Sequence, residues 1–140
     1  MNSMKMTADS WALFLRGSAL FLWMSVIFSF SALPGSEYPF DPTLLYYLER
    51  KGAHVTEYAI LMLLAVRFAF ALFPRLAFKR ILFSAAVFSI LYGASDEWHQ
   101  SFVPYRGAKL SDVAIDGLGI LLMTGILFSV WYIYQRKKTR

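Results

Sequence analysis

The chain has 140 residues, of which 58% are hydrophobic, 18% aromatic and only 16% charged. A soluble domain carries about 25% charged residues and roughly half apolar ones, so this composition excludes an ordinary soluble domain. A formal net charge of +5 would favour nucleic acid as the partner of a soluble protein. In a membrane protein the position of the basic residues matters more, and we expect no nucleic-acid partner. The absence of cysteine excludes disulfides and thiolate metal sites.

Four apolar windows follow one another along the chain, at residues 11–33, 53–73, 80–98 and 112–134. A helix needs about 20 mostly apolar residues to cross the hydrocarbon core of a bilayer. The windows therefore predict an all-α transmembrane four-helix bundle, with residues 1–140 forming a single domain. The first window could instead be a cleaved signal peptide. Its apolar run exceeds the ~7–15 residues of such a segment and has no clear cleavage site, so an uncleaved span is favoured.

Basic residues predict the orientation of the bundle. With four spans, both termini share a side with the loop between the second and third spans. That side holds most of the basic residues, namely Lys5, Arg75, Lys79, Arg80, Arg136, Lys137, Lys138 and Arg140. Because basic residues near span ends mark the cytoplasmic side, we expect a multi-pass protein of the bacterial inner (cytoplasmic) membrane with both termini cytoplasmic. Apart from Asp9, all acidic residues fall at the outward end.

Polar residues gather at the outward ends of the second, third and fourth spans. They are Lys51, His54, Glu57 and Tyr58, then Asp96, Glu97, His99 and Gln100, then Arg106 in the following loop, and Asp112 and Asp116. Steps of three and four residues place members of each set on one helical face. An ionisable group inside a span costs roughly 2.5–3.5 kcal/mol, so such groups normally face the bundle interior. Small residues let helices pack closely, and the fourth span supplies Gly117, Gly119 and Gly125.

Three interpretations of this polar set remain open. The set could be an interhelical ion-pair lock, in which Lys51 and Arg106 neutralise the carboxylates and the histidines pair with acids. It could be a metal site built from the two histidines and nearby carboxylates. H-x-x-E occurs only once and H-E-x-x-H is absent, so the spacing predicts no metal and no other cofactor. It could also be a pocket in which Lys51 and Arg106 hold an anionic headgroup while a carboxylate or imidazole moves a proton.

Two stretches of the sequence carry a family resemblance. "KGAHVTEYAILMLL" and "YGASDEWHQSFVPYRGAKLSDVAIDGLGILL" resemble the VanZ-like family of small bacterial integral membrane proteins. The family pattern is roughly K-x-x-H-x-x-x-Y, D-E-x-x-Q-x-F-x-P-x-R and D-x-x-x-N/D-x-x-G. The matching positions are Lys51, His54, Tyr58, Asp96, Glu97, Gln100, Phe102, Pro104, Arg106, Asp112, Asp116 and Gly119. The family often has glycine where this chain has Tyr105 and asparagine at Asp116. The resemblance implies a link to glycopeptide (teicoplanin) resistance, a phenotype that names no reaction.

We therefore expect an outward-facing polar pocket that binds or modifies an anionic cell-envelope lipid headgroup, of the polyprenyl-phosphate or glycolipid type. The catalytic candidates are His54, Asp96 and Glu97, which could transfer a proton. The binding candidates are Lys51, Glu57, Tyr58, His99, Gln100, Arg106, Asp112 and Asp116. The expected partners are membrane lipids. The alternative is a non-enzymatic accessory or scaffold protein whose polar cluster locks the helices together, and a transporter is less favoured because four short spans leave little room for a pathway.

Overall fold

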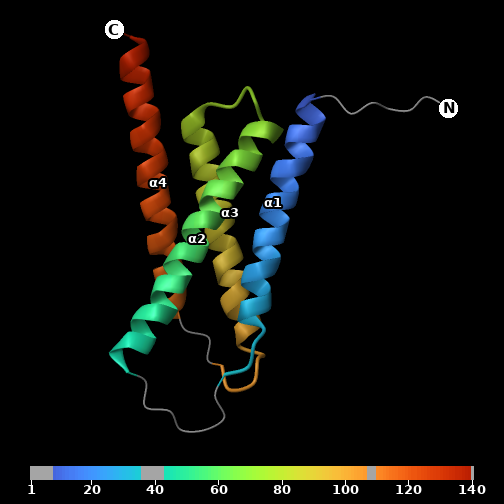
Figure 1. Ribbon diagram of the computed structural model, residues 1–140, viewed down its shortest axis with the longest axis vertical. Helices are drawn as coiled ribbons and strands as arrows, with labels where there is room; N and C mark the ends of the chain where they lie inside the picture. Colours follow the sequence, from blue (N-terminus) through green and yellow to red (C-terminus); the bar gives the residue numbers. More distant parts are fainter. Residues whose placement is uncertain (1–7, 36–42, 107–109, 140) are drawn as a thin grey trace, which may run out of the picture.

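The computed structural model describes residues 8–35, 43–106 and 110–139. They form four helices, α1 (Ala8–Ser31), α2 (Leu44–Leu72), α3 (Phe78–Gln100) and α4 (Leu110–Lys138), shown in Figure 1. All four are long and apolar enough to cross a membrane. No strand occurs in the described part of the chain, so the prediction of an all-α four-helix bundle is confirmed. Lys5 and Arg140, which contributed to the predicted orientation, lie outside the described residues.

The helices extend beyond the apolar windows at several ends. α2 begins at Leu44, well before residue 53, because the intervening segment contains mostly good helix formers and its charged residues do not end a helix. α4 continues through Arg136, Lys137 and Lys138. Cations in the last turn are favourable, since the C-terminal end of a helix carries partial negative charge. Hydropathy thus located the membrane-crossing parts, and helix propensity extends them.

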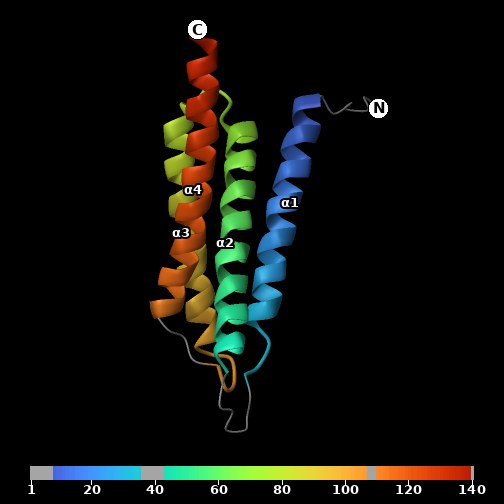
Figure 2. The same ribbon diagram turned by 60° about the vertical axis from the view of Figure 1, so that its left-hand side comes forward.

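α2 is the central helix of the bundle. It packs against each of the other three helices, and most extensively against α4. Figures 1 and 2 show α1 and α4 on opposite sides of α2, and no contact joins α1 to α4 among the described residues. The start of α1, the end of α4 and the loop from α2 to α3 lie at one end of the bundle (Figure 1). The polar ends of α2, α3 and α4 are therefore gathered at the other end.

Apolar side chains lie both inside the bundle and on its surface. Leu61 and Met62 of α2 and Ile81 of α3 belong to the buried core. Other large apolar side chains are widely exposed, including Phe21 (70%) and Phe83 (73%). Exposing such surface to water costs about 25 cal/mol per Å². In a bilayer it contacts lipid tails that are equally apolar, so the surface is that of a membrane protein.

Three side-chain hydrogen bonds tie α1 to its neighbouring helices, one of them from the Arg16 Nη1 group to the Arg67 carbonyl oxygen of α2 at 3.4 Å. The Tyr92 hydroxyl of α3 donates to the Met24 carbonyl oxygen at 2.6 Å. The Trp23 indole N–H donates to the Glu57 carbonyl oxygen of α2 at 2.9 Å. A polar group in the hydrocarbon region needs such a partner. These bonds therefore fix α1 laterally, although it makes fewer contacts than α2.

A single glycine allows α2 and α4 to approach closely. A Cβ at Gly119 would overlap the carbonyl group of Val55. The sequence also assigned this packing role to Gly117 and Gly125, but a Cβ at either position would meet nothing within 4 Å. That part of the prediction is wrong, because these two glycines lie on other faces of α4.

Candidate functional site

A cavity of about 560 Å³ opens at the polar end of the bundle. Its wall is formed by the end of α1, the first turns of α2, the last turns of α3 and Arg106. Its volume falls within the range of roughly 300–1,000 Å³ typical of small-molecule sites. Of the residues singled out from the sequence, five line it: His54, Glu57, Asp96, Gln100 and Arg106.

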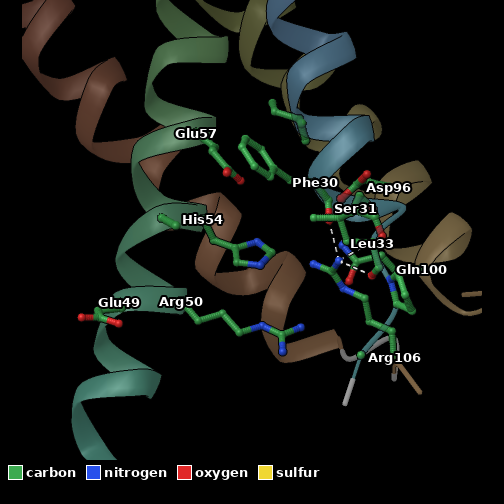
Figure 3. A pocket seen from close by; sticks show the side chains of 14 residues that line it. Phe30, Ser31, Leu33, Glu49, Arg50, His54, Glu57, Asp96, Gln100 and Arg106 are labelled. Carbon is green, nitrogen blue, oxygen red and sulfur yellow. Dashed lines mark hydrogen bonds between the residues drawn. The ribbon is translucent and has the colours of Figure 1, made fainter. Parts of the chain in front are cut away.

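Side chains in the first turns of α2 point in two directions, towards the cavity and towards α4. Arg50, His54 and Glu57 line the cavity, and Figure 3 shows them extending from α2 towards the end of α1 and Arg106. Lys51 faces α4 instead, where its Nζ lies 3.5 Å from Asp112 Oδ1, and its side chain is 46% exposed. Lys51, which the sequence predicted as a cavity cation, therefore lies outside the cavity, and Arg50, which the sequence did not single out, lines it. Both fit a helical repeat that includes His54, so the pattern could not distinguish them.

His54 joins the cavity wall to α4. Its Nδ1 lies 3.0 Å from Asp116 Oδ1 and donates to that carboxylate when Nδ1 carries the proton. Both side chains are buried, at 10% and 2% exposure. Asp116 Oδ2 has no hydrogen-bond partner among the described residues. The pair fixes the imidazole orientation and leaves one carboxylate oxygen available to another group.

Asp96 and Gln100 form the α3 side of the cavity. The Gln100 Nε2 group donates to Asp96 Oδ2 at 2.9 Å. Asp96 is 5% exposed and Gln100 1% exposed. The remaining side-chain oxygens, Asp96 Oδ1 and Gln100 Oε1, have no hydrogen-bond partner in the described part of the chain. Because a buried acceptor without a donor costs about 1–3 kcal/mol, these oxygens favour a ligand that brings hydrogen-bond donors.

Arg106 connects the loop after α3 to the end of α1. Its Nη1 donates to the carbonyl oxygens of Phe30 (2.6 Å), Ser31 (3.1 Å) and Leu33 (3.0 Å), drawn in part as dashed lines in Figure 3. The last carbonyls of a helix have no partner within it, so the guanidinium caps α1. Burial lowers the pKa of Arg106, and the nearby Arg50 cation lowers it further. The sequence predicted anion binding by Arg106 but did not foresee this capping.

The loop carrying Arg106 is docked onto the segment that follows α1. The Gly35 N–H donates to the Pro104 carbonyl oxygen at 3.0 Å, and a Cβ at Gly35 would overlap the Tyr105 carbonyl group. Tyr105 has a φ of 59°, in the left-handed region that favours glycine. A glycine, which the family resemblance implies at this position, would adopt the same backbone without strain. Tyr105 therefore adopts a strained backbone that aims Arg106 at α1.

Besides Lys51, five other predicted residues do not line the cavity. Tyr58 is fully buried, and its ring lies against Gly93 of α3. Glu97 is buried on α3. The His99 ring packs on Phe28 of α1, with ring centroids 4.4 Å apart. Asp112 pairs with Lys51, and Asp116 pairs with His54. His99 thus lies apart from His54, and an interpretation that uses both histidines in one cluster is not supported.

The fold and the site define a class: a four-helix, multi-pass membrane protein with a polar cavity at one end of the bundle. A family model described as VanZ/LLP1 matches residues 17–132. The chain therefore belongs to the VanZ/LLP1 family, and the resemblance drawn from the sequence motifs is confirmed. The match starts within α1 and ends within α4, so it includes all four helices. No curated protein and no solved structure matches the chain.

Proposed function

We propose that the cavity binds the anionic headgroup of a cell-envelope lipid, of the polyprenyl-phosphate or glycolipid type, at the outward face of the bacterial inner membrane. The proposal depends mainly on one observation: two arginines, Arg50 and Arg106, line the same cavity at the end of a membrane bundle. Because the cavity lies at one end of the membrane-spanning helices, it would be level with the lipid headgroups. The basic ends at Arg75–Arg80 and Arg136–Lys138 would then face the cytoplasm.

Electrostatics supports an anionic ligand. Burial, and after it the Arg50 cation, lower the pKa of Arg106 against the opposing effect of the Asp96, Glu97 and Glu57 carboxylates. The two guanidinium groups therefore repel each other across the cavity. An anion between them would relieve that repulsion. A guanidinium also matches the geometry of a phosphate, to which it can donate two parallel hydrogen bonds.

The rest of the cavity lining suits hydrogen-bond donors on the same ligand. Glu57, Asp96 and Gln100 line it, and Asp96 Oδ1 and Gln100 Oε1 lack partners among the described residues. Sugar hydroxyls or amines could donate to these oxygens. A headgroup that combines phosphate with such donors therefore fits the lining better than phosphate alone. Any proton transfer to the ligand would involve His54 and Asp96, which border this space, and not Glu97, which does not line the cavity.

A binding experiment with a matched pair of variants tests the proposal. Purified protein in nanodiscs would be titrated with undecaprenyl phosphate, a phosphate-linked glycolipid and uncharged diacylglycerol, with binding followed by native mass spectrometry. Arg50→Gln should weaken binding of the anionic lipids about 10- to 100-fold, since a hydrogen bond to a charged group contributes about 1.5–3 kcal/mol. Lys51→Gln removes the same charge one residue away, outside the cavity, and should change the affinity less than about threefold. Equal affinity for charged and uncharged lipids would overturn the proposal.

A second candidate is supported by the contacts between helices. Lys51 pairs with Asp112 and His54 with Asp116, while Arg106 caps α1. These contacts suit a scaffold or accessory protein whose polar residues lock the bundle. Asp112→Asn separates the two functions, because Asp112 pairs with Lys51 between α4 and α2 and does not line the cavity. In the lock it should lower protein abundance together with any teicoplanin phenotype, whereas with a binding pocket the protein should stay folded and keep its ligand affinity.

A further inference from the structure

Three helices each bring one potential metal ligand to a common point inside the bundle. The residues are His54 of α2, Glu97 of α3 and Asp116 of α4. One ligand atom from each lies within 4.8 Å of the other two. His54 and Glu97 are 43 positions apart, and Glu97 and Asp116 are 19 apart, so no short motif joins the three residues. Their convergence arises from the packing of α2, α3 and α4.

The distances between the three ligand atoms are close to those found between ligands of a bound metal ion, so small side-chain adjustments would complete the site. Two ligands on a tetrahedral zinc ion, with bonds of about 2.0–2.1 Å, are about 3.3 Å apart. The distance between His54 Nδ1 and Asp116 Oδ1 is already 3.0 Å. One Glu97 carboxylate oxygen lies within 4.8 Å of the His54 and Asp116 ligand atoms, so a small shift of this flexible side chain would complete the set.

An independent observation points to a missing ligand partner at this place. Asp116 is 2% exposed, yet its Oδ2 has no hydrogen-bond partner among the described residues. The fully buried Tyr58 hydroxyl likewise has none there. Both groups meet α3 at Gly93, where an added Cβ would lie 3.4 Å from Asp116 Oδ2 and 3.1 Å from the Tyr58 ring. Gly93 is one helical turn before Glu97 and on the same face.

Charge balance favours a cation at this point. Glu97 and Asp116 place two carboxylates in the bundle interior, and Asp116 keeps one oxygen without a hydrogen-bond partner among the described residues. Carboxylates at membrane depth are costly, so they normally lie against a cationic partner. A divalent cation would neutralise both carboxylates while leaving the imidazole neutral, which is the form that binds metals.

We propose that His54, Glu97 and Asp116 bind a divalent cation of the Zn²⁺ or Mn²⁺ kind. One imidazole nitrogen with two carboxylates is a donor set that these ions accept, whereas Mg²⁺ prefers oxygen ligands alone. Three protein ligands leave at least one coordination position for a further group. Because His54 also lines the cavity, that position would lie beside the cavity. The metal site requires no headgroup and stands independently of lipid binding.

Metal titration of the purified full-length chain tests this proposal without any envelope lipid. After EDTA treatment, Co²⁺ would be added in detergent and its d–d absorption followed, with Zn²⁺ and Mn²⁺ as competitors. The chain has no cysteine, so the spectrum would report nitrogen and oxygen ligands only. We expect saturation at one equivalent, displacement by Zn²⁺, and a higher melting temperature with Zn²⁺ because a ligand of the folded state stabilises it.

Variants of the ligands and of nearby groups complete the test. Asp116→Asn and His54→Ala should each weaken Co²⁺ binding by at least about 100-fold, since even residues that only orient ligands are worth about 10- to 100-fold. His99→Ala and Asp112→Asn change the same residue types outside the cluster and should keep the wild-type affinity. Circular dichroism checks that each variant is folded. Absence of saturable binding by the wild-type protein would overturn the proposal whether or not the variants fold, and so would equal losses in the control variants.

Discussion

Replacing Arg106 with glutamine should detach the end of α1 from the rest of the bundle. The Arg106 Nη1 group donates to three carbonyl oxygens of residues 30, 31 and 33. α1 has few other polar ties to its neighbours, the main ones being the hydrogen bonds from Tyr92 and Trp23. Glutamine is shorter and uncharged, so it can neither reach all three oxygens nor interact with the negative end of the helix.

The expected loss follows from the contacts. Nη1 carries two hydrogens, so its three acceptors share the equivalent of at most two hydrogen bonds, each worth about 1.5–3 kcal/mol when the donor is charged. A cation at a helix C-terminus adds about 0.3–1 kcal/mol. Partial exposure of Arg106 reduces both contributions. We therefore expect Arg106→Gln to lower the free energy of unfolding by about 2–4 kcal/mol.

Two measurements check this prediction. The free energy of unfolding would come from reversible SDS denaturation in mixed micelles, and the position of α1 from spin labels on the Ser29→Cys and Ser101→Cys double variant. The native chain has no cysteine, so both labels are placed uniquely. Arg106→Lys keeps the charge and should lower the free energy of unfolding by about half as much. Lys51→Gln breaks only the exposed pair with Asp112 and should lower it by less than about 1 kcal/mol. If Arg106→Gln costs no more than Lys51→Gln and leaves the label distance unchanged, the capping argument is wrong.

Three further predictions use the same unfolding measurement. Gly119→Ala should destabilise the protein by about 1–3 kcal/mol because its Cβ would overlap the α2 backbone, whereas Gly125→Ala, in open space, should be neutral or stabilise it by up to about 1 kcal/mol. Tyr105→Gly should relieve a left-handed backbone that costs roughly 1–2 kcal/mol and stabilise the protein slightly; a loss above about 1 kcal/mol would contradict this. Tyr92→Phe should cost about 0.5–1.5 kcal/mol by removing the hydrogen bond to Met24, and no loss would contradict that role.

The fold was predictable because membrane insertion imposes a strong constraint on sequence. Each crossing helix requires a long apolar run, and the four windows correspond to the four helices. Helix ends were less predictable, as α2 shows by starting at Leu44. Hydropathy reports where a helix contacts lipid, whereas helix propensity and capping decide where it starts and ends.

The candidate site was predictable only where residues share a helix or a matching depth. Asp96 and Gln100 are four residues apart and were expected on one helical face, where a hydrogen bond joins them. Pairing of a histidine with a carboxylate was expected, but the choice of Asp116 for His54 depends on the close approach of α2 and α4. The contact of Arg106 with α1 joins residues about 75 positions apart and depends on how two loops dock. Arg50 was missed because its neighbour Lys51 fits a helical repeat equally well.

The capping role of Arg106 and the proposed binding role are linked by thermodynamics. The end of α1 forms one wall of the cavity, and that wall is held in place by the Arg106 guanidinium. A headgroup that binds only when α1 is docked must stabilise docking by RT ln(1 + [L]/Kd), which is about 2.7 kcal/mol at 100 times Kd. A variant that loosens α1 must weaken headgroup binding by the corresponding amount. Arg106 variants will therefore lose affinity through α1 even where the anion does not touch residue 106, and Arg50→Gln is the cleaner test of direct anion contact.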